Sequence, residues 1–233
     1  MNVGKIYQLP INEETAYIAG VIVGDGHISN THKANLTKSK DYKIAIEVID
    51  LGFLKKVETS IKSVIQTKST IKKRPKNRGN RKSLYYFNFR NKSFYYFLTD
   101  TLGIPAGRKC SSVRIPQKIF ICMSLQKHFI AGLFDTDGGI RGNTIGFTSA
   151  SKLLMDDVGM ILKNWGFRFY SEKWLNQKYQ RNYYGIKIYK RDSDRFLKYL
   201  PLKNKEKLEK VFRHVDVPEW SNGLDNSLMK IKS

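Results

Sequence analysis

The chain has 233 residues, enough for one large domain or two fused small ones, and its 42 lysines and arginines against 20 acidic residues give a formal net charge of +22, which indicates a nucleic-acid partner. No apolar run approaches the ~20 residues of a membrane-spanning helix, and the first ten residues lack the apolar core of a signal peptide, so a cytoplasmic protein without a membrane partner is expected. Its two cysteines and four histidines have no paired spacing, which argues against a structural zinc site and against zinc-hydrolase or serine-hydrolase chemistry.

An internal repeat organises the rest of the chain. The segment YIAGVIVGDG at residues 17–26 returns as FIAGLFDTDG at residues 129–138, an offset of 112 residues. Apolar periodicity after the first copy predicts strands at 27–37 and 42–50, a helix at 53–65, strands at 67–74 and 84–90, and a helix at 93–102. After the second copy it predicts strands near 140 and at 145–149, a helix at 151–165, strands at 167–175 and 183–190, a helix at 193–200, and a helical tail through residue 212.

The two copies predict two halves with the same element order. Residues 103–124, which contain Pro105, Gly107 and Pro116, have the composition of a linker. We therefore expect an α+β protein with an N-terminal half at 1–116, linker included, and a C-terminal half at 117–233 that carries the helical tail.

Each copy of the repeat is a predicted helix that ends in an acidic residue followed by glycine. A single copy would be an ordinary helix cap with an Asp-Gly turn. A carboxylate at the negative end of a helix is unfavourable unless a cation is near. Two pseudo-symmetric copies can bring Asp25 and Asp137 together, and with the backbone carbonyls of Gly24 and Thr136 they would make a hard-oxygen site suited to Mg²⁺.

Small residues on both predicted helices support a close contact between them. Ala19 and Gly20 in the first copy match Ala131 and Gly132 in the second. Glycine inside a helix costs about 1 kcal/mol relative to alanine, so its presence indicates that the backbones touch.

Residues 18–26 (IAGVIVGDG) and 130–138 (IAGLFDTDG) resemble the two copies of the LAGLIDADG signature, and the chain looks closest to the monomeric, intron-encoded homing endonucleases of archaeal type. The resemblance implies two αββαββα halves packed through the signature helices, with an antiparallel sheet that forms a saddle over DNA. It also implies cleavage of both strands of a long, imperfectly symmetric double-stranded site across the minor groove, which leaves short 3′ overhangs.

The resemblance also assigns roles within the site. Asp25 and Asp137 carry over as the catalytic, metal-binding acids, with Mg²⁺ as the cofactor and Mn²⁺ as a substitute. Asp135 matches a position that is acidic but not catalytic in the signature, and Val23 replaces it in the first copy.

Further catalytic groups are less well marked. Glu47 falls roughly where relatives often have glutamine, with Ser149 as its counterpart in the second half. Lys109, Lys203 and Lys205 are candidates for stabilising the charge of the scissile phosphate. In so basic a chain, each of these lysines could instead contact a DNA backbone phosphate or water.

DNA reading is expected from strand side chains that can reach base edges in the major groove, although many of them would contact phosphates instead. The candidates are basic or amide residues, namely Asn30, Asn35, Lys38, Lys43, Lys72, Arg74, Arg81, Asn88, Arg141, Asn143, Lys173, Gln177, Arg181, Lys187 and Lys190.

Two other functions are compatible with the same fold. One is an RNA-binding intron-splicing cofactor, or maturase, and the other is a non-catalytic DNA-binding regulator. Both signature acids are intact, which disfavours a loss of cleavage. An endonuclease embedded in an intein is also disfavoured, because protein splicing needs a nucleophile at the first residue and usually an asparagine at the last, and the sequence has Met1 and Ser233 there.

Overall fold

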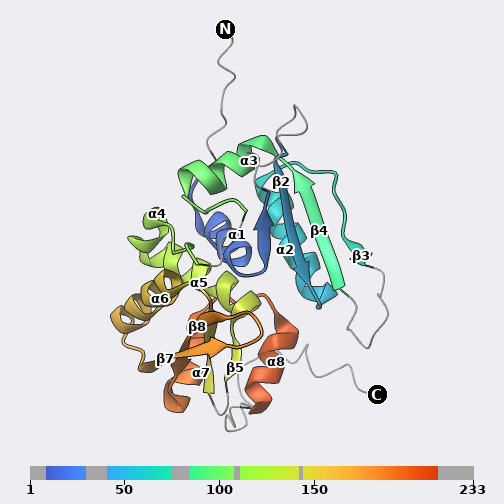
Figure 1. Ribbon diagram of the computed structural model, residues 1–233. Helices are drawn as coiled ribbons and strands as arrows, with labels where there is room; N and C mark the ends of the chain where they lie inside the picture. The colour runs from blue at the N-terminus through green and yellow to red at the C-terminus, as the bar shows by residue number, and fades with distance from the viewer. Residues whose placement is uncertain (1–8, 30–40, 75–83, 108–110, 142–143, 215–233) are drawn as a thin grey trace, which may run out of the picture.

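The computed structural model describes residues 9–29, 41–74, 84–107, 111–141 and 144–214. Two halves lie one above the other in Figure 1, and the helices α1 (Glu13–Gly24) and α5 (Met123–Asp137) lie between them. These two helices contain the repeated segment. Within the described residues, no helix combines the length and the apolar character needed to cross a membrane.

Each half contains a four-stranded antiparallel sheet. The first half is built from β1 (Gly26–Ile28), β2 (Lys43–Val48), α2 (Leu51–Val64), β3 (Lys72–Arg74), β4 (Leu84–Arg90), α3 (Lys92–Tyr96) and a π-helix (Phe97–Thr101). The second is built from α4 (Gln117–Phe120), α5, β5 (Gly139–Arg141), β6 (Thr144–Ser149), α6 (Lys152–Asn164), β7 (Phe169–Asn176), β8 (Arg181–Ile188) and α7 (Lys190–Tyr199), and α8 (Lys205–His214) follows. The strand orders β1-β2-β4-β3 and β5-β6-β8-β7 are equivalent, which confirms the α+β fold with two matching halves.

The predicted elements agree with the structure except in a few places. The strand predicted at 67–74 is confined to β3, because the backbone NH of Ser69 bonds the hydroxyl of Thr67 in a turn. The helix predicted at 93–102 changes to π-helical hydrogen bonding at Phe97. The predicted linker contains the short helix α4. Most of the strand predicted at 27–37 lies outside the described residues, and the boundary at 116/117 stays a prediction.

Local sequence explains where the main helices begin. Asn12 and Thr15 form a reciprocal capping box at the start of α1. Asp50 caps α2 by accepting from Phe53, and Ser151 caps α6. Helix α1 is buried from Thr15 through Val23 because it runs through the middle of the molecule, and this explains its lack of a polar face.

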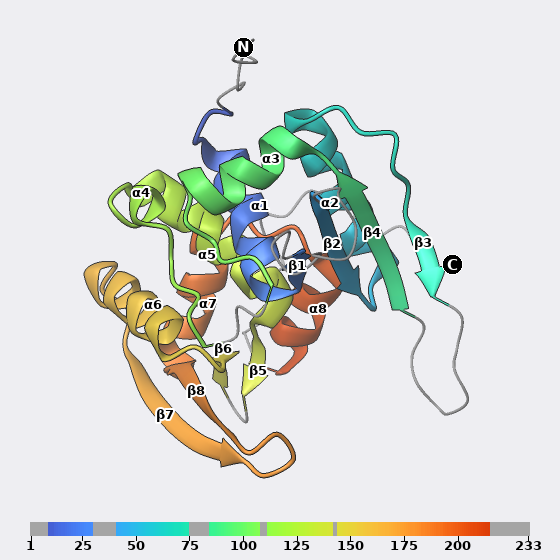
Figure 2. The same ribbon diagram turned by 45° about the horizontal axis from the view of Figure 1, so that its top comes forward.

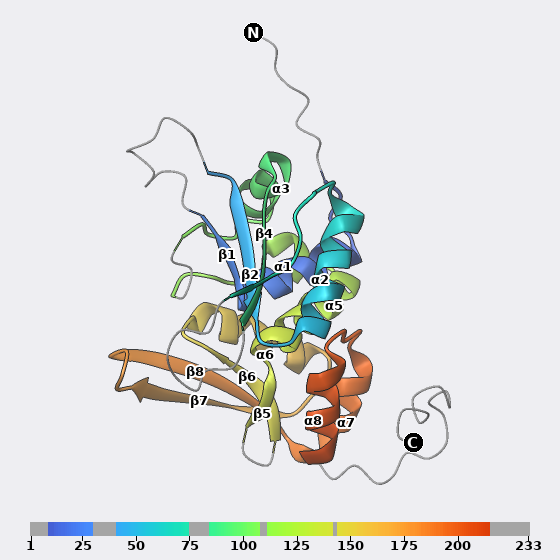
Figure 3. The same ribbon diagram turned by 90° about the vertical axis from the view of Figure 1, so that its right-hand side faces the viewer.

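Each sheet has one apolar face packed on helices and one open face. The alternation in β2 buries Ile44, Ile46 and Val48 and leaves Lys43, Ala45 and Glu47 on the other face. Figure 3 shows β1 and β2 on one side of the first half and α2 on the opposite side. Figure 2 shows the β7–β8 hairpin extending beyond the helices at the edge of the second half.

Candidate active site and nucleic-acid interface

Helices α1 and α5 touch through their glycines. A Cβ atom added to Gly20 would lie 2.1 Å from the carbonyl oxygen of Phe129, and one added to Gly132 would lie 2.2 Å from the carbonyl oxygen of Tyr17. The two contacts are reciprocal, as expected for elements related by a pseudo-twofold axis. Any side chain at either glycine would separate the helices, so the sequence itself sets their distance.

The glycine contact brings the two signature acids to the same end of the helix pair. Asp25 is the exposed C-cap of α1, and Asp137 is the partly buried last residue of α5. A Cβ on Gly24 would lie 3.5 Å from Cγ of Asp137 and 2.0 Å from the hydroxyl oxygen of Thr136. The carboxyl group of Asp137 therefore lies against the last turn of α1, next to Asp25.

Two cationic side chains surround the end of α5. The ammonium of Lys207 donates to the carbonyl oxygens of Phe134 (3.0 Å), Thr136 (2.6 Å) and Gly138 (2.9 Å). Burial lowers the pKa of Lys207 to about 8, although the nearby carboxylates, Asp25 and Asp137 among them, act in the opposite direction.

The second cation is Arg141. Its guanidinium donates to the carbonyl oxygen of Asp137 at 3.1 Å and to the hydroxyl of Thr148 at 2.9 Å. Burial lowers the pKa of Arg141, and Asp137 opposes this shift. Lys207 and Arg141 thus place positive charge at the negative end of the helix that carries Asp137.

The oxygen atoms at this point fit a hard divalent cation. Asp25 and Asp137 supply two carboxylates, and the described residues contain no cluster of three or more His, Cys, Asp or Glu side chains that would complete a protein cage. Further ligands would come from backbone carbonyls, water or DNA phosphates. The carbonyl oxygen of Thr136 already accepts from Lys207, so it offers a metal only its second lone pair.

Comparison with known proteins identifies the fold. Residues 124–201 match the family model of the LAGLIDADG-like domain. The structure of the homing endonuclease I-DmoI in complex with DNA and Ca superposes with a TM-score of 0.61 at 20% identity, over 86% of this chain and 98% of that one. The chain has the LAGLIDADG fold. The homing endonuclease I-WcaI, bound to its DNA recognition sequence, gives a TM-score of 0.56 at 15% identity, over 89% of this chain and 87% of that one.

A curated relative shares the sequence as well. Over 201 residues, which are 86% of its length, this chain is 28% identical to the replication factor C small subunit of Methanocaldococcus jannaschii. The match covers 10% of that protein, so the chain spans about a tenth of the relative's length.

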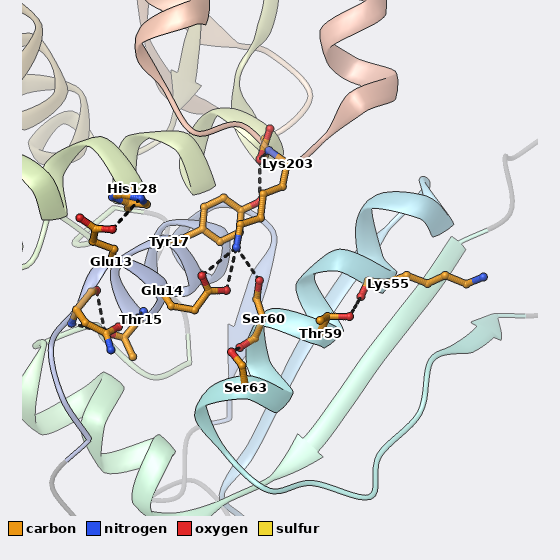
Figure 4. Close-up of polar contacts among 12 residues, drawn as sticks. Glu13, Glu14, Thr15, Tyr17, Lys55, Thr59, Ser60, Ser63, His128 and Lys203 are labelled. Carbon is orange, nitrogen blue, oxygen red and sulfur yellow. Dashed lines mark hydrogen bonds and ion pairs between the residues drawn. The ribbon is translucent and has the colours of Figure 1, made fainter. Parts of the chain in front are cut away.

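Of the lysines predicted to stabilise the scissile phosphate, the structure describes Lys203 and Lys205. Lys203 bonds both carboxylate oxygens of Glu14, at 2.8 and 3.1 Å, and the hydroxyl of Ser60 at 2.8 Å, as Figure 4 shows. Glu14 lies in the first turn of α1, at the opposite end from Asp25, so these contacts do not support the catalytic role predicted for Lys203, which stays a prediction. Lys205 is exposed at the start of α8.

The structure places Lys205 close to Lys56. Burial lowers the pKa of Lys56, and the nearby charge of Lys205 adds to this effect. Lys205 therefore lies by α2 and does not line the groove of about 440 Å³ that joins Asp25, Glu47 and Lys207. Its role at the phosphate also stays a prediction, and Lys109 lies outside the described residues.

Sequence reasoning missed Lys207 because α8 follows the repeat and has no counterpart in it. The sequence does hold one signal for it: Val211 is an apolar residue four positions further on, which puts Lys207 on the apolar face of the predicted helix, and the structure buries Val211.

Glu47 has a different counterpart from the one predicted. His27 pairs with Ala45, and its counterpart in the repeat, Gly139, pairs with Gly146, so the residue equivalent to Glu47 is Thr148, two positions further along each strand. Ser149 follows Thr148 in β6 and therefore points to the other face of the sheet, where its hydroxyl accepts from the backbone NH of Ser151. Glu47 itself binds Arg74 on the open face.

Most described DNA-reading candidates share the open faces of the two sheets. Direct pairing places Lys43, Lys72, Arg74 and Asn88 on the face of Glu47 in the first half. In the second half Arg141, Arg181 and Lys187 share the open face. Asn30, Asn35, Lys38, Arg81 and Asn143 lie outside the described residues.

Three candidates lie elsewhere. Lys173 is in register with Tyr184 on the opposite face of the hairpin, so it does not share the open face with the other candidates, and its contact with DNA stays a prediction. Gln177 is in the turn after β7, and Lys190 begins α7 and does not end a strand. The sequence did not single out Trp174 and Tyr183, whose rings stack on the open face with centroids 6.0 Å apart.

Proposed function

We propose that this chain is a site-specific homing endonuclease that cuts both strands of double-stranded DNA with a divalent metal. The observation that carries the proposal is the reciprocal contact of Gly20 and Gly132, which brings Asp25 and Asp137 to one end of two parallel helices. One carboxylate from each half suits two antiparallel strands. Both signature helices belong to one chain, so we propose that a monomer acts on each site.

Charge supports DNA as the partner. The formal net charge is +22, and the open faces of both sheets carry lysine and arginine. I-DmoI, with the same fold, has been solved in complex with DNA and Ca and in complex with DNA and Mn. We extend this partner to the present chain, with a long, imperfectly symmetric target because the two open faces differ in sequence.

The chemistry we propose is hydrolysis of a phosphodiester at the paired acids. Asp25 and Asp137 would hold Mg²⁺, or Mn²⁺ in its place, and the metal would activate water and stabilise the leaving oxygen. Lys207 and Arg141 would stabilise negative charge on the phosphate at the second-half acid. Glu47 and Thr148, at equivalent positions of β2 and β6, would hydrogen-bond water at the site.

The test is selection of cleaved sites from a randomised plasmid library with purified protein, in Mg²⁺ and in EDTA. We expect double-strand cuts with short 3′ overhangs that disappear in EDTA and in Asp25→Asn and Asp137→Asn. Asp156→Asn, an exposed acid on α6, is the matched control and should cut as the parent does. Cleavage that survives both signature substitutions, or a stable complex with RNA but not with DNA, would refute the proposal.

A further inference from the structure

The buried acid of the second signature, Asp135, is bound to the segment that starts α8. It is 2% exposed. Its carboxylate accepts hydrogen bonds from the backbone NH groups of Lys203 (2.7 Å) and Asn204 (3.2 Å), and from the hydroxyl of Tyr17 (2.7 Å). Burial raises the pKa of Asp135, and these hydrogen bonds act against the shift. Three donors thus converge on one buried carboxyl group.

Asn204 continues the connection from Asp135 into α8. Its side-chain NH₂ donates to the carbonyl oxygen of Asp135 at 3.1 Å, and its side-chain oxygen accepts from the backbone NH of Lys207 at 3.0 Å. Asn204 is therefore both the cap of α8 and a partner of Asp135. A carboxylate beside the first NH groups of a helix also stabilises it through the helix dipole.

Lys207 depends on this geometry. It is the third residue of α8, and its ammonium must meet three carbonyl oxygens around the end of α5. A shift of about 1 Å at the start of the helix would break these contacts, because hydrogen bonds weaken steeply beyond their normal length. We propose that Asp135 is a positioning residue, which fixes the start of α8 and thereby holds Lys207 beside Asp137. Its effect on cleavage rests on the proposed function.

The first signature has no carboxyl group at the equivalent position. Val23 stands where the repeat offset places Asp135, and its buried apolar side chain has no oxygen atom that could accept hydrogen bonds as the carboxyl group of Asp135 does. The anchor therefore belongs to the half that carries Asp137. Its loss should slow the cut made with Asp137 more than the cut made with Asp25, whereas a general loss of stability would slow both.

The first experiment needs no DNA. Hydrogen exchange of residues 205–214 and acylation of Lys207 by acetic anhydride, read by mass spectrometry, are compared in the metal-free parent and in variants. In Asp135→Asn both should accelerate by about tenfold or more, the size expected when a hydrogen bond to a charged group is lost. Asn204→Ala, which leaves the buried carboxyl in place, should change both rates in the same direction. Tyr17→Phe is the matched control, because it removes one donor to Asp135 but none of the links to α8.

The outcome that overturns the proposal is specific. One such outcome is that hydrogen exchange in α8 and acylation of Lys207 stay at the parent rates in both Asp135→Asn and Asn204→Ala. The other is that Tyr17→Phe accelerates both rates as much as Asp135→Asn does. Either outcome would show that Asp135 does not position the helix. Strand-resolved cleavage gives the second readout: the strand that Asp137→Asn affects more should be the one slowed in Asp135→Asn, with DNA affinity unchanged. A parent that cuts no DNA refutes the proposed function and leaves the exchange result to decide the anchor.

Discussion

Asp25 and Asp137 lie at the negative ends of two helices whose backbones touch, so the end of the helix pair accumulates negative charge. Lys207 and Arg141 offset part of it from the second half. Both cations are held by backbone oxygens, which fixes their positions before any substrate arrives. A preorganised cation stabilises developing charge at less cost than one that must move.

Lys207 and Lys205 lie two residues apart on α8, and comparing them tests which lysine serves the site. Lys207→Met should lower kcat by about 100-fold, because it removes a fixed charge near the phosphate. DNA affinity should stay near that of the parent, since Lys207 lies against backbone carbonyls and off the open faces of the sheets.

Lys205→Met is the matched control in the same turn, and kcat should stay within about twofold of the parent because the side chain is exposed and beside α2. Steady-state cleavage with excess DNA measures kcat, and a filter assay measures affinity. Equal losses in the two variants would contradict the assignment of Lys207.

At the scale of the elements, the contact between α1 and α5 depends on glycine. Gly52, by contrast, has room for a side chain. It is exposed in the first turn of α2, where an added Cβ would meet only a side-chain oxygen of Asp50 at 3.2 Å. Glycine in a helix is normally a loss of about 1 kcal/mol. The two sites therefore predict opposite signs for the same substitution.

Gly132→Ala should lower the free energy of unfolding by about 1–3 kcal/mol, because the new methyl group would lie 2.2 Å from the carbonyl oxygen of Tyr17 and the helices must separate. Gly52→Ala should be neutral or raise it by up to about 1 kcal/mol. Urea unfolding measures both. A Gly132→Ala variant as stable as the parent would show that the helices pack differently.

Sequence alone predicted the elements that the repeat duplicates, because two copies of one pattern support each other. It did not predict Lys207, whose helix lies outside the repeat and whose target is a set of backbone oxygens that no side-chain pattern encodes. The sequence predicts Ser149 as the counterpart of Glu47 and the structure has Thr148 there, because successive residues of a strand face opposite sides and the register is set by pairing with β5. The repeat alone was enough to single out the two signature acids, Asp25 and Asp137, in the sequence.

Across the whole molecule, the tail after α7 connects the two halves. Lys203 binds Glu14 and Ser60 in the first half, and Lys56 donates to the carbonyl oxygen of Lys203 at 2.8 Å. Burial acts to raise the pKa of Glu14, but hydrogen bonds from Lys203 and Ser60 outweigh it and hold the pKa below its usual range. An ion pair distant from the acids thus holds both halves and the start of α8 together.

The open faces of the two sheets should bind duplex DNA mainly through phosphate contacts, so affinity should fall steeply with salt. Lys43 and Lys173 give a matched pair: Lys43 lies on the open face of the first sheet, and Lys173 lies on the opposite face of the β7–β8 hairpin. Each substitution by glutamine removes one charge from the net +22, so a difference between them reports on the face and not on total charge. Lys43→Gln should reduce the slope of log Kd against log salt by about one, because one phosphate contact is lost. Lys173→Gln should leave the slope unchanged in the same titration, which is followed by fluorescence anisotropy. A larger change of slope in Lys173→Gln than in Lys43→Gln would show that DNA binds the opposite face.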